Sequence, residues 1–159
     1  MEGYLFPDTY QFDLNATEED MINTMLRNTE RKLSKDITER ASSLGFSLDK
    51  LLTLASIIEA ESGNPYDQYK ISRVFHNRLY YDWNLESDAT INYLLKLEGK
   101  ETVWTANNEQ LQIDNPYNTY KHEGLPPGPI SNPGLNAIKA ALYPDTCLLY
   151  TSPSPRDAT

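Results

Sequence analysis

The sequence contains a single cysteine, Cys147, among its 159 residues. One cysteine excludes an internal disulfide and any metal site built from several thiolates. The only two histidines, His76 and His122, do not have the spacing of metal ligands. We therefore expect neither a metal nor another cofactor.

Basic residues are also scarce, with 14 Lys and Arg against 23 Asp and Glu, so the net charge is −9 and the pI about 4.6. A nucleic-acid-binding protein needs a basic face to neutralise phosphates, and an anionic membrane surface repels an acidic protein. No apolar run approaches the length of a membrane span, and the N-terminus lacks a charged-then-apolar signal pattern. We expect no nucleic-acid partner and no membrane segment in this chain.

What the sequence does contain is typical of one globular domain. Hydrophobic residues make up 39% of the chain, which is long enough for a real core but short for two domains. The 11 tyrosines and 2 tryptophans suit a surface that stacks on sugar rings, although tyrosine is equally a core residue.

The most informative stretch runs from Ser47 to Pro65 and predicts a central helix. Ser47 is a suitable N-cap, and Gly63-Asn64-Pro65 predicts that the helix ends at Pro65 or before. Its apolar residues cover more than half of the helix circumference, so the helix should be mostly surrounded by protein: Leu48, Leu51, Leu52, Leu54, Ala55, Ile57 and Ile58.

Two carboxylates, Glu59 and Glu61, lie in the last turn of this helix, within or beside its apolar arc. Lost hydration and the negative end of the helix dipole both raise a carboxyl pKa, which keeps a glutamate protonated for use as a general acid. The alternative is an exposed or salt-bridged glutamate, which is by far the commoner situation for an arbitrary glutamate.

The flanking segments predict further helices. Residues 2–12 read as a short strand or loop, and residues 17–44 as one long amphipathic helix. Residues 67–82 predict a second buried helix that carries Asn77 and Arg78, side chains able either to fix a helix end or to grip a ligand. Asp88 is either the N-cap of a short helix or a second active-site carboxylate.

The C-terminal half is less regular. Residues 98–115 predict a loop with helical fragments, and residues 117–130 predict a connection that its prolines make rigid. Such a connection can position polar groups around a cleft or simply turn a corner. Ser131-Asn132 should cap a last helix that begins at Pro133.

Several ordered motifs together resemble one family. They are Ala55-Ser56-Ile57-Ile58-Glu59-Ala60-Glu61-Ser62, Val74-Phe75-His76-Asn77-Arg78-Leu79, Leu85-Glu86-Ser87-Asp88-Ala89-Thr90, Tyr117-Asn118-Thr119-Tyr120 leading into Gly124-Leu125-Pro126-Pro127-Gly128-Pro129-Ile130, and the opening Glu2-Gly3-Tyr4-Leu5-Phe6-Pro7-Asp8-Thr9-Tyr10. This pattern, from Glu2 to about Pro144, resembles the MltG (YceG-like) endolytic murein transglycosylases. The resemblance implies an α+β, predominantly helical, lysozyme/transglycosylase-like catalytic domain with few short strands.

The resemblance also implies a reaction and a catalytic residue. The reaction is cleavage of MurNAc-β-1,4-GlcNAc bonds within peptidoglycan glycan strands, which leaves 1,6-anhydroMurNAc ends. Glu61 would protonate the glycosidic oxygen and then, as carboxylate, deprotonate the sugar's own 6-hydroxyl. The residues that would bind the glycan or support the site are Glu59, Ser62, Asn77, Arg78, Asp88, Tyr117, Asn118, Thr119 and Tyr120.

The family's domain plan implies that this chain is the catalytic portion only, because its members begin with a membrane anchor and a LysM-like domain. We expect residues 1–144 to form a partial catalytic domain, truncated at its C-terminus, and residues 145–159 to be a non-native or unstructured tail. The resemblance implies that the full-length family protein lies at the extracytoplasmic face of the bacterial cell membrane, with cell-wall synthases as expected partners.

Two alternatives remain open from the sequence. If Asp88 positions a water molecule against Glu61, the domain would be an inverting muramidase-type hydrolase. If truncation has removed essential residues, the domain would be a non-catalytic peptidoglycan-binding module.

Overall fold

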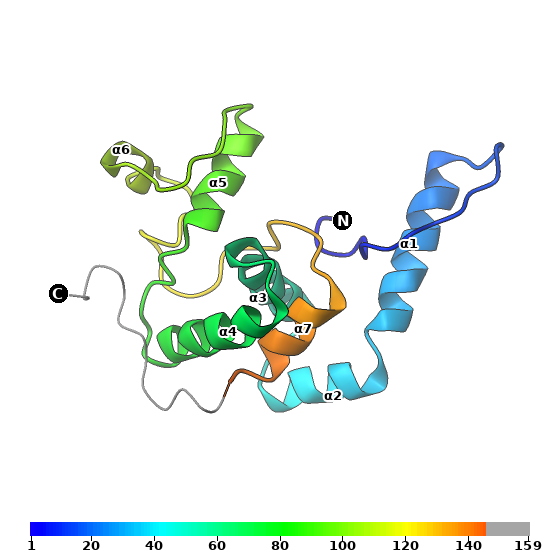
Figure 1. Cartoon of the computed structure of the whole chain (residues 1–159), viewed down its shortest axis with the longest axis horizontal. Helices are drawn as coiled ribbons and strands as arrows, with labels where there is room; N and C mark the ends of the chain where they lie inside the picture. The colour runs from blue at the N-terminus through cyan, green and yellow to red at the C-terminus, as the bar shows by residue number, and fades with distance from the viewer. Residues whose placement is uncertain (146–159) are drawn as a thin grey trace.

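A computed structural model describes residues 1–145 as helices joined by loops (Figure 1). The helices are α1 (Glu18–Lys32), α2 (Lys35–Ser43), α3 (Leu48–Glu61), α4 (Pro65–Tyr80), α5 (Asp88–Leu97), α6 (Asn108–Leu111) and α7 (Leu135–Leu142). The predominantly helical class is confirmed, whereas the few short strands are not, since no strand occurs between residues 1 and 145. The expectation of a non-native tail falls on residues that, from 146 onward, lie outside the described part.

The helix α3 forms the centre of the core, as the sequence predicts. Ser47 caps it by accepting a hydrogen bond from the Lys50 amide at 3.2 Å, and residues 51–58 are all buried. It packs mainly against α7 and also against α2, α4 and α5. The helix ends at Glu61, before Pro65, as the sequence predicts. Asn64 is the N-cap of the next helix, α4, whose first residue is Pro65.

The opening segment is a loop because it is held by side chains and not by another strand. The Asn132 Oδ1 atom accepts hydrogen bonds from the Gly3 and Leu5 amides at 2.7 and 3.1 Å, and Thr29 Oγ1 accepts one from the Phe6 amide at 3.0 Å. These bonds use the backbone donors that a β-ladder would need. The Asn132 side chain therefore binds the opening segment and does not cap the helix that follows it.

Two predicted helix boundaries need correction. The single helix predicted over residues 17–44 is interrupted at Leu33, whose ψ of 68° is not helical, and Ser34 starts α2 as its N-cap. The break allows Ile37 and Ala41 of α2 to be buried in the core. The last helix begins at Leu135, with Gly134 as its N-cap, rather than at Pro133.

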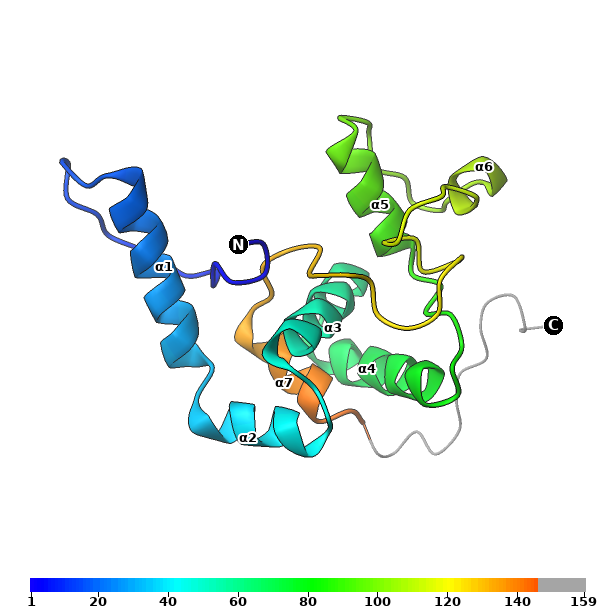
Figure 2. The same cartoon turned by 180° about the vertical axis from the view of Figure 1, so that it is seen from behind.

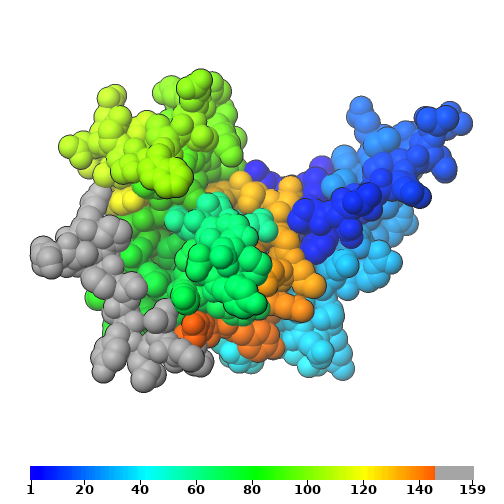
Figure 3. All heavy atoms as spheres, viewed as in Figure 1, coloured from blue at the N-terminus to red at the C-terminus, as the bar shows by residue number. Residues whose placement is uncertain are grey.

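Two parts project from opposite sides of the core formed by α3, α4 and α7. One is α1; the other is the α5–α6 lobe, residues 88–123, and the rear view shows the same separation (Figures 1 and 2). The space-filling view shows a dip in the surface between them, with residues around 125–135 at its base (Figure 3). Among the described residues no single helix is long and apolar enough to cross a membrane; α2 and α3 pass that test only together, across a 93° bend.

Candidate active site

The candidate site lies where the end of α3 meets the start of α5. Glu61 is the last residue of α3, and its Oε1 atom accepts a hydrogen bond from the Oγ–H of Ser87. Ser87 is the N-cap of α5 and Asp88 is the first helical residue, so the prediction of Asp88 as N-cap is off by one. The carboxyl group of Glu61 thus faces the partially positive N-terminus of α5.

The environment of Glu61 raises its pKa, in the direction predicted from the sequence. Burial among neighbouring protein atoms is the largest cause of the rise above the ordinary value of 4.5, and the charge of Asp88 adds to it. The bond from Ser87 opposes the rise most strongly, followed by the Ala89 amide and the charge of Arg78. The residue also keeps a solvent-exposed side. Glu61 is therefore partly desolvated yet accessible, as expected for a proton donor that must reach a substrate.

A buried hydroxyl network fixes Ser87. Its amide donates to Thr119 Oγ1 at 2.9 Å, its carbonyl accepts from Thr90 Oγ1 at 2.8 Å, and the two threonine hydroxyls are 2.9 Å apart. All three residues are at least nine-tenths buried. The position of the Ser87 hydroxyl relative to Glu61 is consequently set by the fold and not by solvent.

The segment 117–120 fixes the second carboxylate. The Tyr120 hydroxyl donates to Asp88 Oδ1 at 2.7 Å. Asn118 is fully buried; its Nδ2 donates to the Leu111 and Ile113 carbonyls and its Oδ1 accepts from the Tyr120 amide. Because Asn118 and Thr119 are buried, their side chains bond within the fold, which favours the supporting role over direct contact with a glycan.

Arg78 is buried behind the site. One of its guanidinium N–H groups donates to the Leu85 carbonyl in the loop between α4 and α5. At the end of this loop Glu86 has a φ of 52°, a left-handed conformation uncommon for a residue with a side chain, and its amide donates to the Thr119 carbonyl at 3.1 Å. Arg78 and Glu86 thereby set the path of the chain into Ser87.

The other residues predicted for the site do not bond to Glu61, Ser87 or Asp88. Glu59 Oε1 accepts from the Gly134 amide at 3.0 Å and so holds the start of α7. Ser62 Oγ accepts from the Asn64 amide at 3.1 Å in the turn before α4. Within residues 1–145, neither Asn77 nor Tyr117 has a hydrogen bond to Glu61, Ser87 or Asp88. The Tyr117 ring contacts the Tyr93 ring at a tilt of 40°, with ring centroids 4.9 Å apart.

A pocket of about 280 Å³ lies near Glu61, because Ala89, whose amide bonds to the Glu61 carboxyl group, is one of its lining residues; Glu61 itself does not line it. It includes Ala60, which precedes Glu61, and Ala89, which follows Asp88. The other lining residues come from α5, from the loop after it and from the connection before α7: Asn92, Tyr93, Lys96, Thr102, Ile130 and Ser131. In the described part of the chain no three His, Cys, Asp or Glu side chains gather as metal ligands would.

The sequence-based reasoning did not assign a role to Ser87. The only local signal was its place before Asp88, where a serine is a good N-cap. Its contact with Glu61 joins residues 26 positions apart, so no local pattern could predict it.

One expected result follows from the raised pKa alone: Glu61→Gln should melt at a higher temperature than the parent near neutral pH. The folded chain binds the Glu61 proton more tightly than the unfolded chain, so the free energy of unfolding falls as pH rises above 4.5 through the folded pKa. Glutamine does not ionise and avoids that loss.

Thermal scans against pH should show that the difference in melting temperature between Glu61→Gln and the parent shrinks below pH 4.5. The control for the loss of one charge is Glu30→Gln, on the exposed face of α1. A difference that is constant with pH, or negative at neutral pH, would contradict the prediction.

The fold and site define a helical domain with an accessible, partly desolvated carboxyl group where the end of α3 meets the start of α5. The sequence matches the YceG-like family over residues 1–155. It is 41% identical over 152 residues to an endolytic murein transglycosylase of Bacillus subtilis (strain 168), covering 94% of this chain and 41% of that protein. A protein of the same name from Streptococcus pneumoniae (strain D39) is 37% identical, with 89% of this chain and 26% of that protein covered.

The structural comparison agrees with these matches. The crystal structure of a YceG-like protein from Listeria monocytogenes superposes with a TM-score of 0.81 at 40% identity, covering 91% of this chain and 46% of that one. The chain belongs to the YceG-like family. It spans less than half the length of each of these relatives.

Proposed function

We propose that this chain is the catalytic part of an endolytic murein transglycosylase, with Glu61 as the single general acid and base. The observation that carries the proposal is the Glu61 carboxyl group, which has a raised pKa, an exposed side and a fixed hydrogen bond from Ser87. The names of the relatives from Bacillus and Streptococcus support the same activity. A lysozyme-like arrangement, an extracytoplasmic location and contacts with cell-wall synthases stay predictions from the family resemblance.

In the proposed reaction Glu61 donates its proton to the glycosidic oxygen between MurNAc and GlcNAc, and the bond to the anomeric carbon breaks. The resulting carboxylate takes the proton of the MurNAc 6-hydroxyl, whose oxygen closes the 1,6-anhydro ring on that carbon. No water is consumed. Glu61 therefore ends the reaction protonated, ready for another cleavage.

The rival reaction is hydrolysis, because Asp88 is a second carboxylate close enough for its charge to raise the pKa of Glu61. If Asp88 activated water, the products would be hydrolytic and heavier by one water molecule. Mass spectrometry of glycan strands digested by this chain separates the two: anhydro ends support the proposal, and reducing ends overturn it in favour of a hydrolase. Binding of strands without any released fragment would instead indicate a non-catalytic module.

A second expected result concerns Ser87. Ser87→Ala should lower kcat/KM by about 10 to 100-fold, because the acid loses the bond that positions it. That bond lowers the pKa of Glu61, so its loss should also raise this pKa and move the high-pH limb of the activity profile to higher pH. Steady-state rates against pH provide the measurement, with Ser42→Ala on the exposed face of α2 as the control. An unchanged profile would show that Ser87 only caps α5.

A further inference from the structure

We propose, on the basis of the proposed function, that the pocket beside Glu61 is a carboxylate-binding subsite in which Lys96 recognises an acidic substituent of the sugar next to the cleaved bond. Its volume of about 280 Å³ is near the lower end of the range for ligand pockets, about 300–1,000 Å³, which suits one substituent better than a length of strand. Its place next to Ala60 and Ala89 puts it near the carboxyl group of Glu61.

The polar groups of the pocket divide into two kinds. Asn92 is used internally: its side chain donates to the Val103 carbonyl at 3.0 Å and accepts from the Val103 amide at 2.9 Å. Tyr93 is also used, since its hydroxyl donates to Glu2 Oε2 at 2.7 Å. The Asn92 bonds fix the loop after α5, which supplies Thr102 to the wall of the pocket, and the Tyr93 bond holds the Tyr93 side chain against the N-terminal segment, which does not line the pocket.

The other polar groups are free to bind a ligand. Within the described residues, neither the Lys96 ammonium nor the hydroxyls of Thr102 and Ser131 have a hydrogen bond or ion pair. An ammonium group has only donors, and hydroxyls can donate as well, so the set is matched to an anion. In a chain of net charge −9, an unpaired lysine on the wall of a pocket gives that pocket a local charge opposite to its surroundings.

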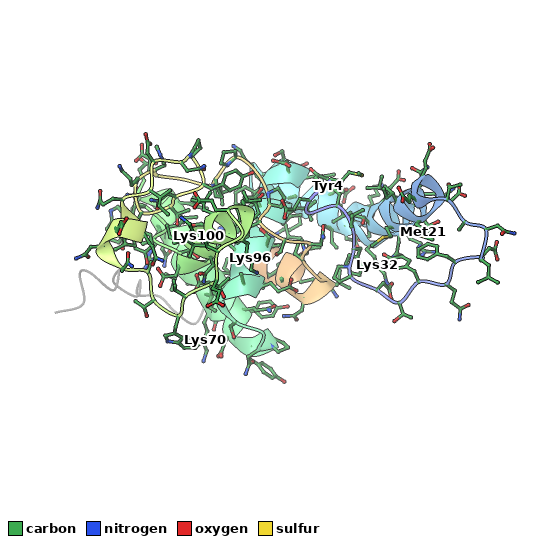
Figure 4. The ribbon with its side chains drawn as sticks, turned by 90° about the horizontal axis from the view of Figure 1, so that it is seen from above. Tyr4, Met21, Lys32, Lys70, Lys96 and Lys100 are labelled. Atoms are coloured by element: carbon green, nitrogen blue, oxygen red, sulfur yellow. The ribbon has the colours of Figure 1, made fainter. Side chains whose placement is uncertain are left out.

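A nearby lysine provides a matched control. Lys100 follows α5 by three residues, but its Nζ pairs with Glu98 at 2.6 Å and it lines a different hollow, beside α6. Figure 4 labels both side chains in the α5 region, with Lys32 and Met21 in the separate α1 region. Loss of either lysine removes one positive charge from the same lobe, but only Lys96 lines the pocket beside Glu61.

The carboxylate has two chemical sources on murein. In strands without peptides it is the lactyl carboxylate of MurNAc; in strands with peptides the lactyl group is in amide linkage and the carboxylates belong to the peptide. Both present the same group to an ammonium ion. The experiment therefore includes both kinds of strand, together with peptide-free strands whose lactyl carboxylates have been converted to methyl esters.

Binding is measured on the full chain carrying Glu61→Gln, so that strands are not consumed. Adding Lys96→Gln should weaken binding of carboxylate-bearing strands by about tenfold, and adding Lys100→Gln should change it less than twofold. Methyl-ester strands should bind both double variants equally. Dependence on Lys96 with peptide-free strands alone assigns the pocket to the lactyl carboxylate, and dependence with peptide-bearing strands alone assigns it to the peptide.

Two results would overturn the inference. Equal binding of acidic strands by the Lys96→Gln and Lys100→Gln variants would exclude a special role for Lys96, while leaving the proposed transglycosylase activity intact. Equal weakening of acidic and methyl-ester strands by Lys96→Gln would exclude carboxylate recognition. Absence of binding to any strand would overturn both this inference and the proposed function.

Discussion

Glu61→Gln should reduce the release of glycan fragments by about 1,000-fold or more, because general acid catalysis contributes roughly 10² to 10⁴-fold and here one group serves as both acid and base. Glutamine keeps the shape of the side chain and can still accept the hydrogen bond from Ser87. The fold and the affinity for strands should therefore be preserved. Fragment release, measured by chromatography at equal enzyme concentration, gives the ratio.

Glu59→Gln is the matched control for that variant. Glu59 Oε1 accepts a hydrogen bond from the Gly134 amide, and a glutamine oxygen can accept the same bond. Its activity should remain within about threefold of the parent, because no proton transfer is assigned to it. Loss of activity in Glu59→Gln with retention in Glu61→Gln would reverse the assignment within the pair.

Asn118→Ala should lower the free energy of unfolding by about 3 kcal/mol, the largest stability effect expected among the site residues. The change leaves the Leu111 and Ile113 carbonyls and the Tyr120 amide without their buried partner, and each unsatisfied group costs about 1–3 kcal/mol before any solvent enters. For a chain of this length the loss corresponds to a fall in melting temperature of roughly 6–12 °C.

Asn23→Ala is the control for this substitution, because Asn23 is exposed on α1. Alanine is the better helix former, so the control should be neutral or slightly stabilising. Thermal and urea unfolding of both variants would measure the difference. A change of less than about 1 kcal/mol in Asn118→Ala would show that the α5–α6 lobe does not depend on this side chain.

The sequence by itself determined the features that depend on near neighbours. Ser47, Asn64 and Pro65 fix the limits of α3 and α4 through caps and prolines that act within a few residues. The apolar surface of α3 determined that this helix would be central and buried. The same signals placed a carboxylate pair at its end, but the residues alone did not distinguish Glu59 from Glu61; the family resemblance made that choice.

The tertiary structure decided which side chains meet. Glu61 accepts a hydrogen bond from Ser87, and Glu59 accepts one from the start of α7. Asn132 accepts one from Gly3, which is 129 residues away in the chain. The absence of a strand in the opening segment has the same origin, since Asn132 and Thr29 accept the hydrogen bonds of the Leu5 and Phe6 amides that a β-ladder would use. A local pattern encodes the preference of a residue for a cap or a turn. The hydrogen-bond partner of a polar side chain is decided only when distant segments pack together, because packing removes water and leaves the side chain only the polar groups beside it.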